Sequence, residues 1–142
     1  MKKGTFLCME YEIPAMLKSR VGSIVNMSST AGLQGVKGMG GFVAGKHAII
    51  RLSHIAALDY GRQNIRINVA APGPILTECL IRVRNGERIS LGVPMGRIGN
   101  REDVATVVAW LSSDLTSFVR GSTITIDGGR MSGTWFCSPM SP

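Results

Sequence analysis

The chain has 142 residues, of which 44% are hydrophobic and 18% are charged, and it contains no long low-complexity run. This composition excludes a disordered chain, and the length suits one globular domain with its own core. It leaves too little chain for a cofactor domain followed by a separate substrate domain. We therefore expect one folded unit over residues 1–131, with a tail over 132–142 that shows no periodic pattern and is expected to be disordered.

The formal net charge is +7 at pH 7, and five arginines lie between residues 82 and 101. These arginines form no continuous run, and no aromatic residues are interleaved among them. A solvated surface is therefore a better interpretation than a nucleic-acid interface, so we expect no nucleic-acid partner.

The cysteines bear on the compartment in which the chain works. Cys8, Cys79 and Cys137 are odd in number and widely spaced, which argues against a disulfide framework or a zinc site. The apolar stretch near the N-terminus is interrupted by Glu10 and Glu12, so it is too short for a signal peptide or a membrane span. We expect a cytoplasmic protein with no metal and no membrane partner.

The rest of the pattern alternates helices with short β-branched runs. In chain order we expect a helix over 6–19, a strand over 23–27, a helix over 42–60, a strand over 65–70, a helix from Asn100 to Leu111 and a strand over 123–127. Asn100 is a suitable N-cap, with Glu102 and Asp103 in the first helical turn. The sequence Pro-Gly-Pro at 72–74 should stop the second strand, and a turn at 127–129 should end the third.

Strands that alternate with helices favour parallel pairing through right-handed crossovers. The sequence thus predicts an α/β fold with a small, partial doubly wound parallel sheet of about three strands and flanking helices. Strand 23–27 is apolar enough to be covered on both faces. In so small a sheet it would lie near an edge, where unpaired backbone groups invite association.

The residues that are candidates for catalysis or binding lie near the end of the first expected strand and on the helix that follows it. Ser28 and Ser29 come at the carboxyl end of strand 23–27, where open α/β sheets place their ligands. Phe42 and Lys46 are four residues apart, so they share one helix face. Taken singly, each has an ordinary structural explanation: a strand end, a core ring or a solvated lysine.

The combination is more specific, and it resembles the short-chain dehydrogenase/reductase family. The resemblance is carried by the segments 22–32 (GSIVNMSSTAG), 42–46 (FVAGK), 67–77 (INVAAPGPILT) and 127–129 (DGG). It implies that residues 1–131 correspond to the C-terminal half of a Rossmann-like domain, with the first strands of that fold absent. It also implies an NAD(P)-dependent oxidoreductase acting on a small-molecule alcohol or carbonyl.

The resemblance assigns roles to three residues. The serine matching Ser29 hydrogen-bonds the substrate oxygen, and a tyrosine at position 42 exchanges a proton with it. The lysine matching Lys46 lowers the phenol pKa and binds the nicotinamide ribose. Phe42 has no hydroxyl, which predicts a loss of roughly 10²- to 10⁴-fold in rate. A fourth position, an asparagine in the family, falls on Met1.

The resemblance also points to a cofactor loop. Backbone and side-chain groups matching Pro72, Gly73, Ile75 and Thr77 hold the nicotinamide end of NAD or NADP, although this segment alone indicates only a turn. The glycines at 35–40 imitate a phosphate-binding loop, but their spacing and their place in the chain are wrong. We therefore expect weak or absent NAD(P) binding by this chain, and cofactor preference cannot be read from it.

Two interpretations remain open at this stage. The first is an oxidoreductase of this family that is inactive or impaired. The second is a non-catalytic binding or self-association module, because in the family the helices matching 6–19 and 42–60 pack against a second subunit. A homo-oligomer through these helices is expected in both. A basic surface recruited to nucleic acid is a third, weaker interpretation.

Overall fold

The computed structural model describes residues 2–78 and 92–133. Its elements, in chain order, are α1 (Lys2–Ser19), β1 (Gly22–Met27), η1 (Thr30–Gly32), α2 (Gly40–Asp59), η2 (Gly61–Gln63), β2 (Ile65–Pro72), α5 (Arg101–Ser112), η3 (Asp114–Thr116) and β3 (Thr123–Ile126). The elements labelled η are single 3₁₀ turns. All six helices and strands expected from the sequence are present.

The three strands form one parallel sheet in the order β1-β2-β3. Ile24 of β1 lies opposite Ile67 of β2, and Val69 of β2 lies opposite Thr123 of β3. The central strand β2 is buried from Ile65 through to residue 71, as a strand covered on both faces should be. The predicted partial doubly wound sheet is confirmed, and within the described residues β1 and β3 are its edges.

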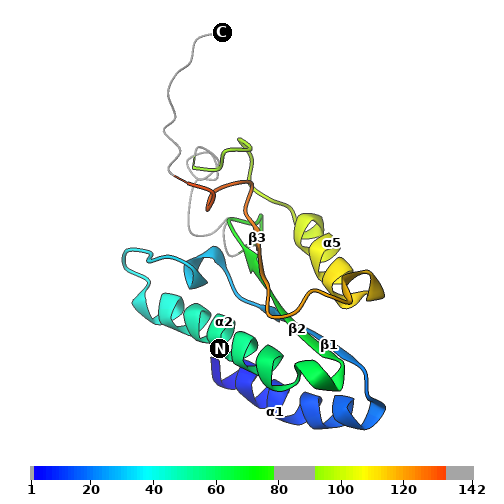
Figure 1. Cartoon of the computed structure of the whole chain (residues 1–142). Helices are drawn as coiled ribbons and strands as arrows, with labels where there is room; N and C mark the ends of the chain where they lie inside the picture. Colours follow the sequence, from blue (N-terminus) through cyan, green and yellow to red (C-terminus); the bar gives the residue numbers. More distant parts are fainter. Residues whose placement is uncertain (1, 79–91, 134–142) are drawn as a thin grey trace, which may run out of the picture.

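Helices cover both faces of this sheet (Figure 1). Helices α1 and α2 lie side by side on one face, and α5 lies on the other. The main core forms where α1 and α2 meet the sheet, and it buries apolar side chains from four elements: Met9, Ile13, Ile24, Ala56, Ala57, Ile65 and Ile67. Burial of this apolar surface is the chief stabilising contribution, and it sets the position of α2 against the sheet.

The opposite face of β2 carries polar residues. The Arg66 guanidinium donates to the carbonyl oxygens of Leu111 (2.7 Å) and Ser113 (3.1 Å), which the end of α5 leaves without helical partners. Asn68 accepts from the Ser122 N–H (3.0 Å) and donates to the Val119 oxygen (2.9 Å). These contacts fix the end of α5 and the approach to β3.

Several element ends differ from the expected ones. Helix α1 begins at Lys2 rather than at residue 6 and continues through Pro14, and α2 begins at Gly40. Strand β2 continues through Pro72, because residues 71 and 72 pair with residues 125 and 126 of β3. Such pairing is a tertiary contact, which the local turn signal at 72–74 does not register.

Some expectations concern residues outside the described ranges, namely Met1, Cys79, Cys137 and the arginines at 82, 84 and 88. The proposed tail is described only to residue 133. Among the helices that the structure describes, none combines the length and the apolar character needed to cross a membrane.

Candidate functional site

The carboxyl end of β1 is tied to helix α2. The Ser28 hydroxyl donates to the Lys46 carbonyl oxygen at 2.9 Å and is buried. Gly32 lies in the same contact: a Cβ there would come within 2.6 Å of Ser28 Oγ and 2.9 Å of the Lys46 oxygen. A side chain at position 32 would therefore push α2 away from the strand, so glycine is required for this close approach.

Ser29 bridges the ends of two strands. Its hydroxyl oxygen accepts from the Ala31 N–H at 3.2 Å, which caps η1, and the hydroxyl donates to the Pro72 carbonyl oxygen at 3.3 Å. The donor bond is long for an O–H group. A substrate oxygen placed at this edge would therefore compete with a weak intramolecular acceptor for the Ser29 proton.

Phe42 and Lys46 lie one turn apart on α2, as their spacing predicts. The Lys46 ammonium lies 5.7 Å from the centroid of the Phe42 ring, within the range of a cation–π contact, and it donates to the Met27 carbonyl oxygen at 3.1 Å. Both side chains are half-buried. Burial lowers the pKa of Lys46, because desolvation disfavours its charged form.

The segment after β2 is held against β3. The Gly73 N–H donates to the Ile126 oxygen at 3.0 Å, and a Cβ at Gly73 would lie 2.7 Å from the Cβ of Asp127. Farther along, Ile75 forms an isolated parallel bridge with Gly99, and Thr77 is half-buried. Of the predicted cofactor residues, Pro72 thus contacts Ser29. Ile75 pairs instead with Gly99, a contact that the sequence did not predict.

A pocket of about 460 Å³ adjoins this loop. It lies between the loop after β2, the segment before α5 and the turn after β3, and its lining includes Ile75, Arg97, Asp103 and Asp127. From the sequence, Arg97 is expected only as a solvated arginine and Asp103 only as an acid of the first helical turn. The Asn100-x-x-Asp103 spacing of a capping box signals the contact between Asp103 and the Asn100 N–H, but it does not signal the ion pair with Arg97.

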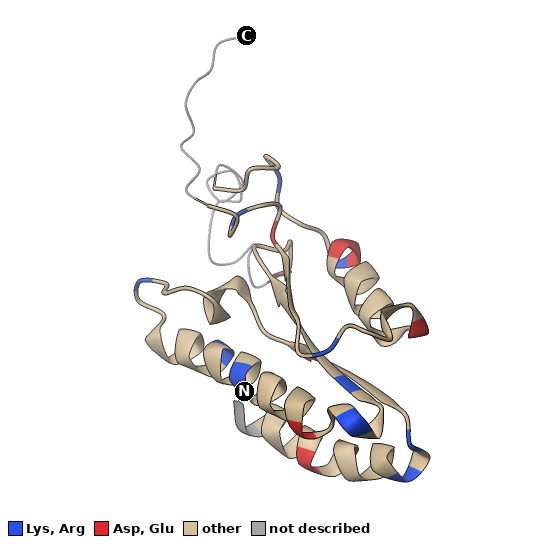
Figure 2. Ribbon diagram, in the orientation of Figure 1, with Lys and Arg blue, Asp and Glu red and all other residues tan. Residues whose placement is uncertain are grey.

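The His47 side chain forms a local contact within helix α2. Its Nδ1 lies 3.0 Å from the Val43 carbonyl oxygen one turn earlier in α2, which is a local hydrogen bond. Among the described residues, no group of three His, Cys, Asp or Glu side chains is placed so that it could hold a metal ion. Figure 2 shows the basic residues of the same part of the chain scattered over several elements rather than gathered on one face.

Known proteins with similar sequences are oxidoreductases. A family model described as enoyl-(acyl carrier protein) reductase matches residues 2–131. A cyclohexanol dehydrogenase from an Acinetobacter strain is 45% identical over 129 residues, which are 91% of this chain and 51% of the relative. A 2,5-dichloro-2,5-cyclohexadiene-1,4-diol dehydrogenase from Sphingobium indicum is 42% identical over 89% of this chain and 53% of the relative.

Several solved structures are similar to this chain in fold. The structure of ElxO with NADP bound superposes with a TM-score of 0.87 at 36% identity, covering 92% of this chain and 54% of the neighbour. A Tyr-to-Phe variant of ElxO with NADPH bound also has a TM-score of 0.87. Levodione reductase has a TM-score of 0.88 at 33% identity over 93% of this chain and 55% of its own. The chain thus spans about half the length of the relatives it matches.

Proposed function

Because the chain belongs to the short-chain dehydrogenase/reductase family, we propose that the carboxyl edge of its sheet is an NAD(P)-dependent site for a small alcohol or carbonyl. In this proposal the Ser29 hydroxyl binds the substrate oxygen, and Lys46 binds the nicotinamide ribose. The segment from Pro72 to Thr77 contacts the nicotinamide end. A bound cofactor would supply the hydride, so these residues have only to bind, orient and handle protons.

The observation that carries this proposal is the position of the Lys46 ammonium. It is half-buried on the face that Phe42 occupies, and it is anchored to the Met27 carbonyl at 3.1 Å. A partly desolvated ammonium at the carboxyl edge of a parallel sheet is well suited to a ribose hydroxyl or a developing alkoxide. Helix α2 and strand β1 hold it there through the Ser28–Lys46 hydrogen bond.

We further propose that proton transfer at this site is impaired. Phe42 fills the volume of a tyrosine ring but carries no group that can give or take a proton. His47, the nearest alternative in sequence, is bonded locally to Val43. The missing step would cost roughly 10²- to 10⁴-fold in turnover.

Restoring the hydroxyl tests the proposal. With cyclohexanol or a related cyclic alcohol and about 1 mM NAD(P), Phe42→Tyr is expected to raise kcat by ~10²-fold or more. Phe42→Leu is the matched control, because it changes the ring without adding a hydroxyl, and it should stay at the wild-type level. A Phe42→Tyr variant that binds cofactor but gains no turnover would count against the assigned site.

Weak cofactor binding is part of the same proposal. The glycines at 35–40, between β1 and α2, lack the spacing with which backbone amides at a helix N-terminus would hold the pyrophosphate. NADH and NADPH fluorescence should therefore show no saturation at micromolar concentrations. Saturable micromolar binding would contradict this part of the proposal, and loss of that binding in Lys46→Ala would still locate it at this site.

A second candidate function is self-association. Helices α1 and α2 leave a mostly apolar groove of about 260 Å³ between them, lined by Phe6, Ile13, Leu52 and Ile55 among others. Phe6 and Ile55 are 49% and 56% exposed. Exposed apolar residues that line a groove between two helices are typical of an interaction surface, which supports a homo-oligomer formed through residues 6–19 and 42–60.

A further inference from the structure

A short segment before α5 lies against the loop that we assign to the nicotinamide. The Leu76 N–H donates to the Gly99 carbonyl oxygen at 2.8 Å, and the Gly99 N–H donates to the Pro74 oxygen at 3.0 Å. These two bonds make a small parallel ladder, separate from the main sheet, in which Ile75 lies opposite Gly99. The backbone position of Ile75 is therefore set by Gly99.

The approach of the two segments is close. A Cβ at Gly99 would lie 2.6 Å from Cδ1 of Ile75, well inside van der Waals contact. A side chain at position 99 would force the end of the Ile75 side chain to move, so glycine suits this close pairing of the two backbones. Whatever fixes residues 97–100 therefore also fixes the loop from Pro74 to Leu76.

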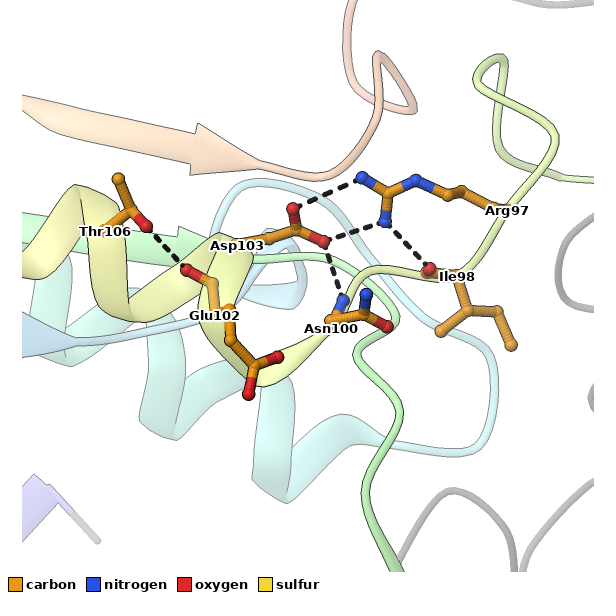
Figure 3. A network of polar contacts seen from close by, with 6 residues as sticks. All are labelled: Arg97, Ile98, Asn100, Glu102, Asp103 and Thr106. Atoms are coloured by element: carbon orange, nitrogen blue, oxygen red, sulfur yellow. Dashed lines mark hydrogen bonds and ion pairs between the residues drawn. The ribbon is translucent and has the colours of Figure 1, made fainter.

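Asp103 fixes residues 97–100 from the first turn of α5 (Figure 3). Its Oδ2 accepts from the Asn100 N–H at 2.7 Å, and its two oxygens accept from the Arg97 guanidinium at 2.8 and 3.2 Å. Arg97 also donates to the Ile98 carbonyl oxygen at 3.2 Å. One carboxylate thus holds the backbone on both sides of Gly99.

The contacts of Asp103 affect the position of the backbone more than the stability of the fold. An exposed ion pair contributes little to stability, and the Arg97 and Asp103 side chains are 47% and 34% exposed. A planar guanidinium bound through two nitrogens nevertheless restricts orientation as well as distance. Arg97 holds the pKa of Asp103 at about 2, helped by the Asn100 N–H, so the carboxylate stays ionised at neutral pH.

We propose that Asp103 is a positioning residue for the loop that carries Ile75 and Thr77, acting through Arg97 and Asn100 on Gly99. It touches neither substrate nor cofactor in this proposal. It holds the loop backbone in one position before any ligand arrives, which removes an ordering cost from binding. What the loop contacts rests on the proposed function, whereas the clamp itself does not.

Amide hydrogen exchange on the full chain tests the clamp without any cofactor. Asp103→Ala is expected to speed exchange at Leu76 and Gly99 by ~10-fold or more, because both amides depend on the ladder. The Ser28 amide, bonded to the Ala70 oxygen at 2.8 Å in the main sheet, should be unchanged. Asp103→Glu, which keeps the charge, should restore part of the protection.

Glu102→Ala is the matched control. It removes a neighbouring carboxylate from the same helical turn, and Figure 3 shows the Glu102 side chain pointing away from the network. It should leave exchange at Leu76 and Gly99 unchanged. Equal acceleration at Leu76, Gly99 and Ser28 in Asp103→Ala, or no acceleration at any of them, would overturn the proposal, since the effect would then be global or absent.

A cofactor titration separates this inference from the proposed function. If millimolar NADPH protects the Leu76 amide in the wild type, Asp103→Ala should weaken that apparent affinity by ~10-fold, and an unchanged affinity would overturn the positioning role. If NADPH protects nothing in the wild type, the proposed function fails at this loop. The exchange measured without cofactor then decides the clamp alone.

Discussion

Among single residues, Phe42 determines which partners its neighbour Lys46 has. With a phenylalanine there, the ammonium has an aromatic face at 5.7 Å and a backbone carbonyl at 3.1 Å as partners, and neither can pass on a proton. A tyrosine hydroxyl would add an acid whose pKa the ammonium lowers. Phe42 thus packs against Lys46 without offering a group that can exchange a proton.

The buried Arg66 leads to a prediction about stability. Arg66 is 7% exposed, and its guanidinium donates to Leu111, Ser113 and Thr116, where α5 passes into η3. Arg66→Met would fill much of the volume but remove the charged donor, leaving the Leu111 and Ser113 oxygens only the neutral donors Ser23 and Thr116. We therefore expect a loss of about 2 kcal/mol or more in the free energy of unfolding.

Urea denaturation of the wild type and of Arg66→Met measures this loss in the free energy of unfolding. Arg62→Met is the control, because it removes an exposed arginine of η2 and should change the free energy of unfolding by less than ~0.5 kcal/mol. Equal losses in the two variants would show that net charge, rather than the buried contacts, is responsible.

Residues at the site and in the core differ in how far sequence patterns predict their contacts. The pairing of Phe42 with Lys46 follows from the four-residue spacing on a helix and was predictable. The roles of Arg66 and Asn68 were not, because an apolar run that contains two polar residues predicts only a buried strand. Their partners lie 45 to 54 positions away in the sequence, so no local pattern connects them.

At the scale of elements, helix α5 is anchored by its first turn. Asp103 has a pKa of about 2 in the folded chain, below its ordinary value of 3.8, mainly because of the hydrogen bond from Arg97. A carboxyl group whose pKa is lowered by folding stabilises the fold above its unfolded pKa. That contribution is lost as the pH falls from 3.8 towards 2.

Thermal unfolding as a function of pH checks this prediction. The Tm of the wild type should exceed that of Asp103→Asn by a constant amount above about pH 5, and the difference should shrink towards zero near pH 2. Glu102→Gln, which leaves the network intact, is the control. A difference that persists unchanged at about pH 2 would show that the ionised carboxylate is not the stabilising form.

Sequence patterns predict the helices and strands, but they do not predict the ladder between residues 74–76 and Gly99. The order of helices and strands, and Asn100 as the residue before α5, follow from short-range periodicity and capping, and they are confirmed. The ladder between residues 74–76 and Gly99 depends on backbone groups that any residues could supply. Only the glycine at 99 hints at a close approach, and a lone glycine is too common to be informative.

At the scale of the whole molecule, the sheet is small for its fold class. Within residues 2–78 and 92–133, three strands leave β1 at an edge, and its buried residues alternate, with Ile24 and Asn26 inside and Met27 exposed. The expectation that β1 is covered on both faces is thus met only in part. The relatives that the chain matches are about twice as long, so their activities remain proposals for this chain.

The exposed groove between α1 and α2 leads to a prediction about assembly. Ile55 lines the groove and is 56% exposed, and Leu58 of the same helix is 83% exposed. If two copies meet there, a charge at position 55 would be buried without a partner. Ile55→Glu is then expected to raise the dimer dissociation constant by ~100-fold or more, measured by sedimentation velocity over a concentration series.

Leu115→Glu supplies the matched comparison for this experiment. Leu115 is 84% exposed on η3, a separate element from the groove, and the substitution changes the net charge by the same amount. It should leave the dissociation constant within about twofold of the wild type, because no interface charge is buried. A wild-type chain that stays monomeric at ~100 μM, or a dimer that both variants weaken equally, would contradict assembly through α1 and α2.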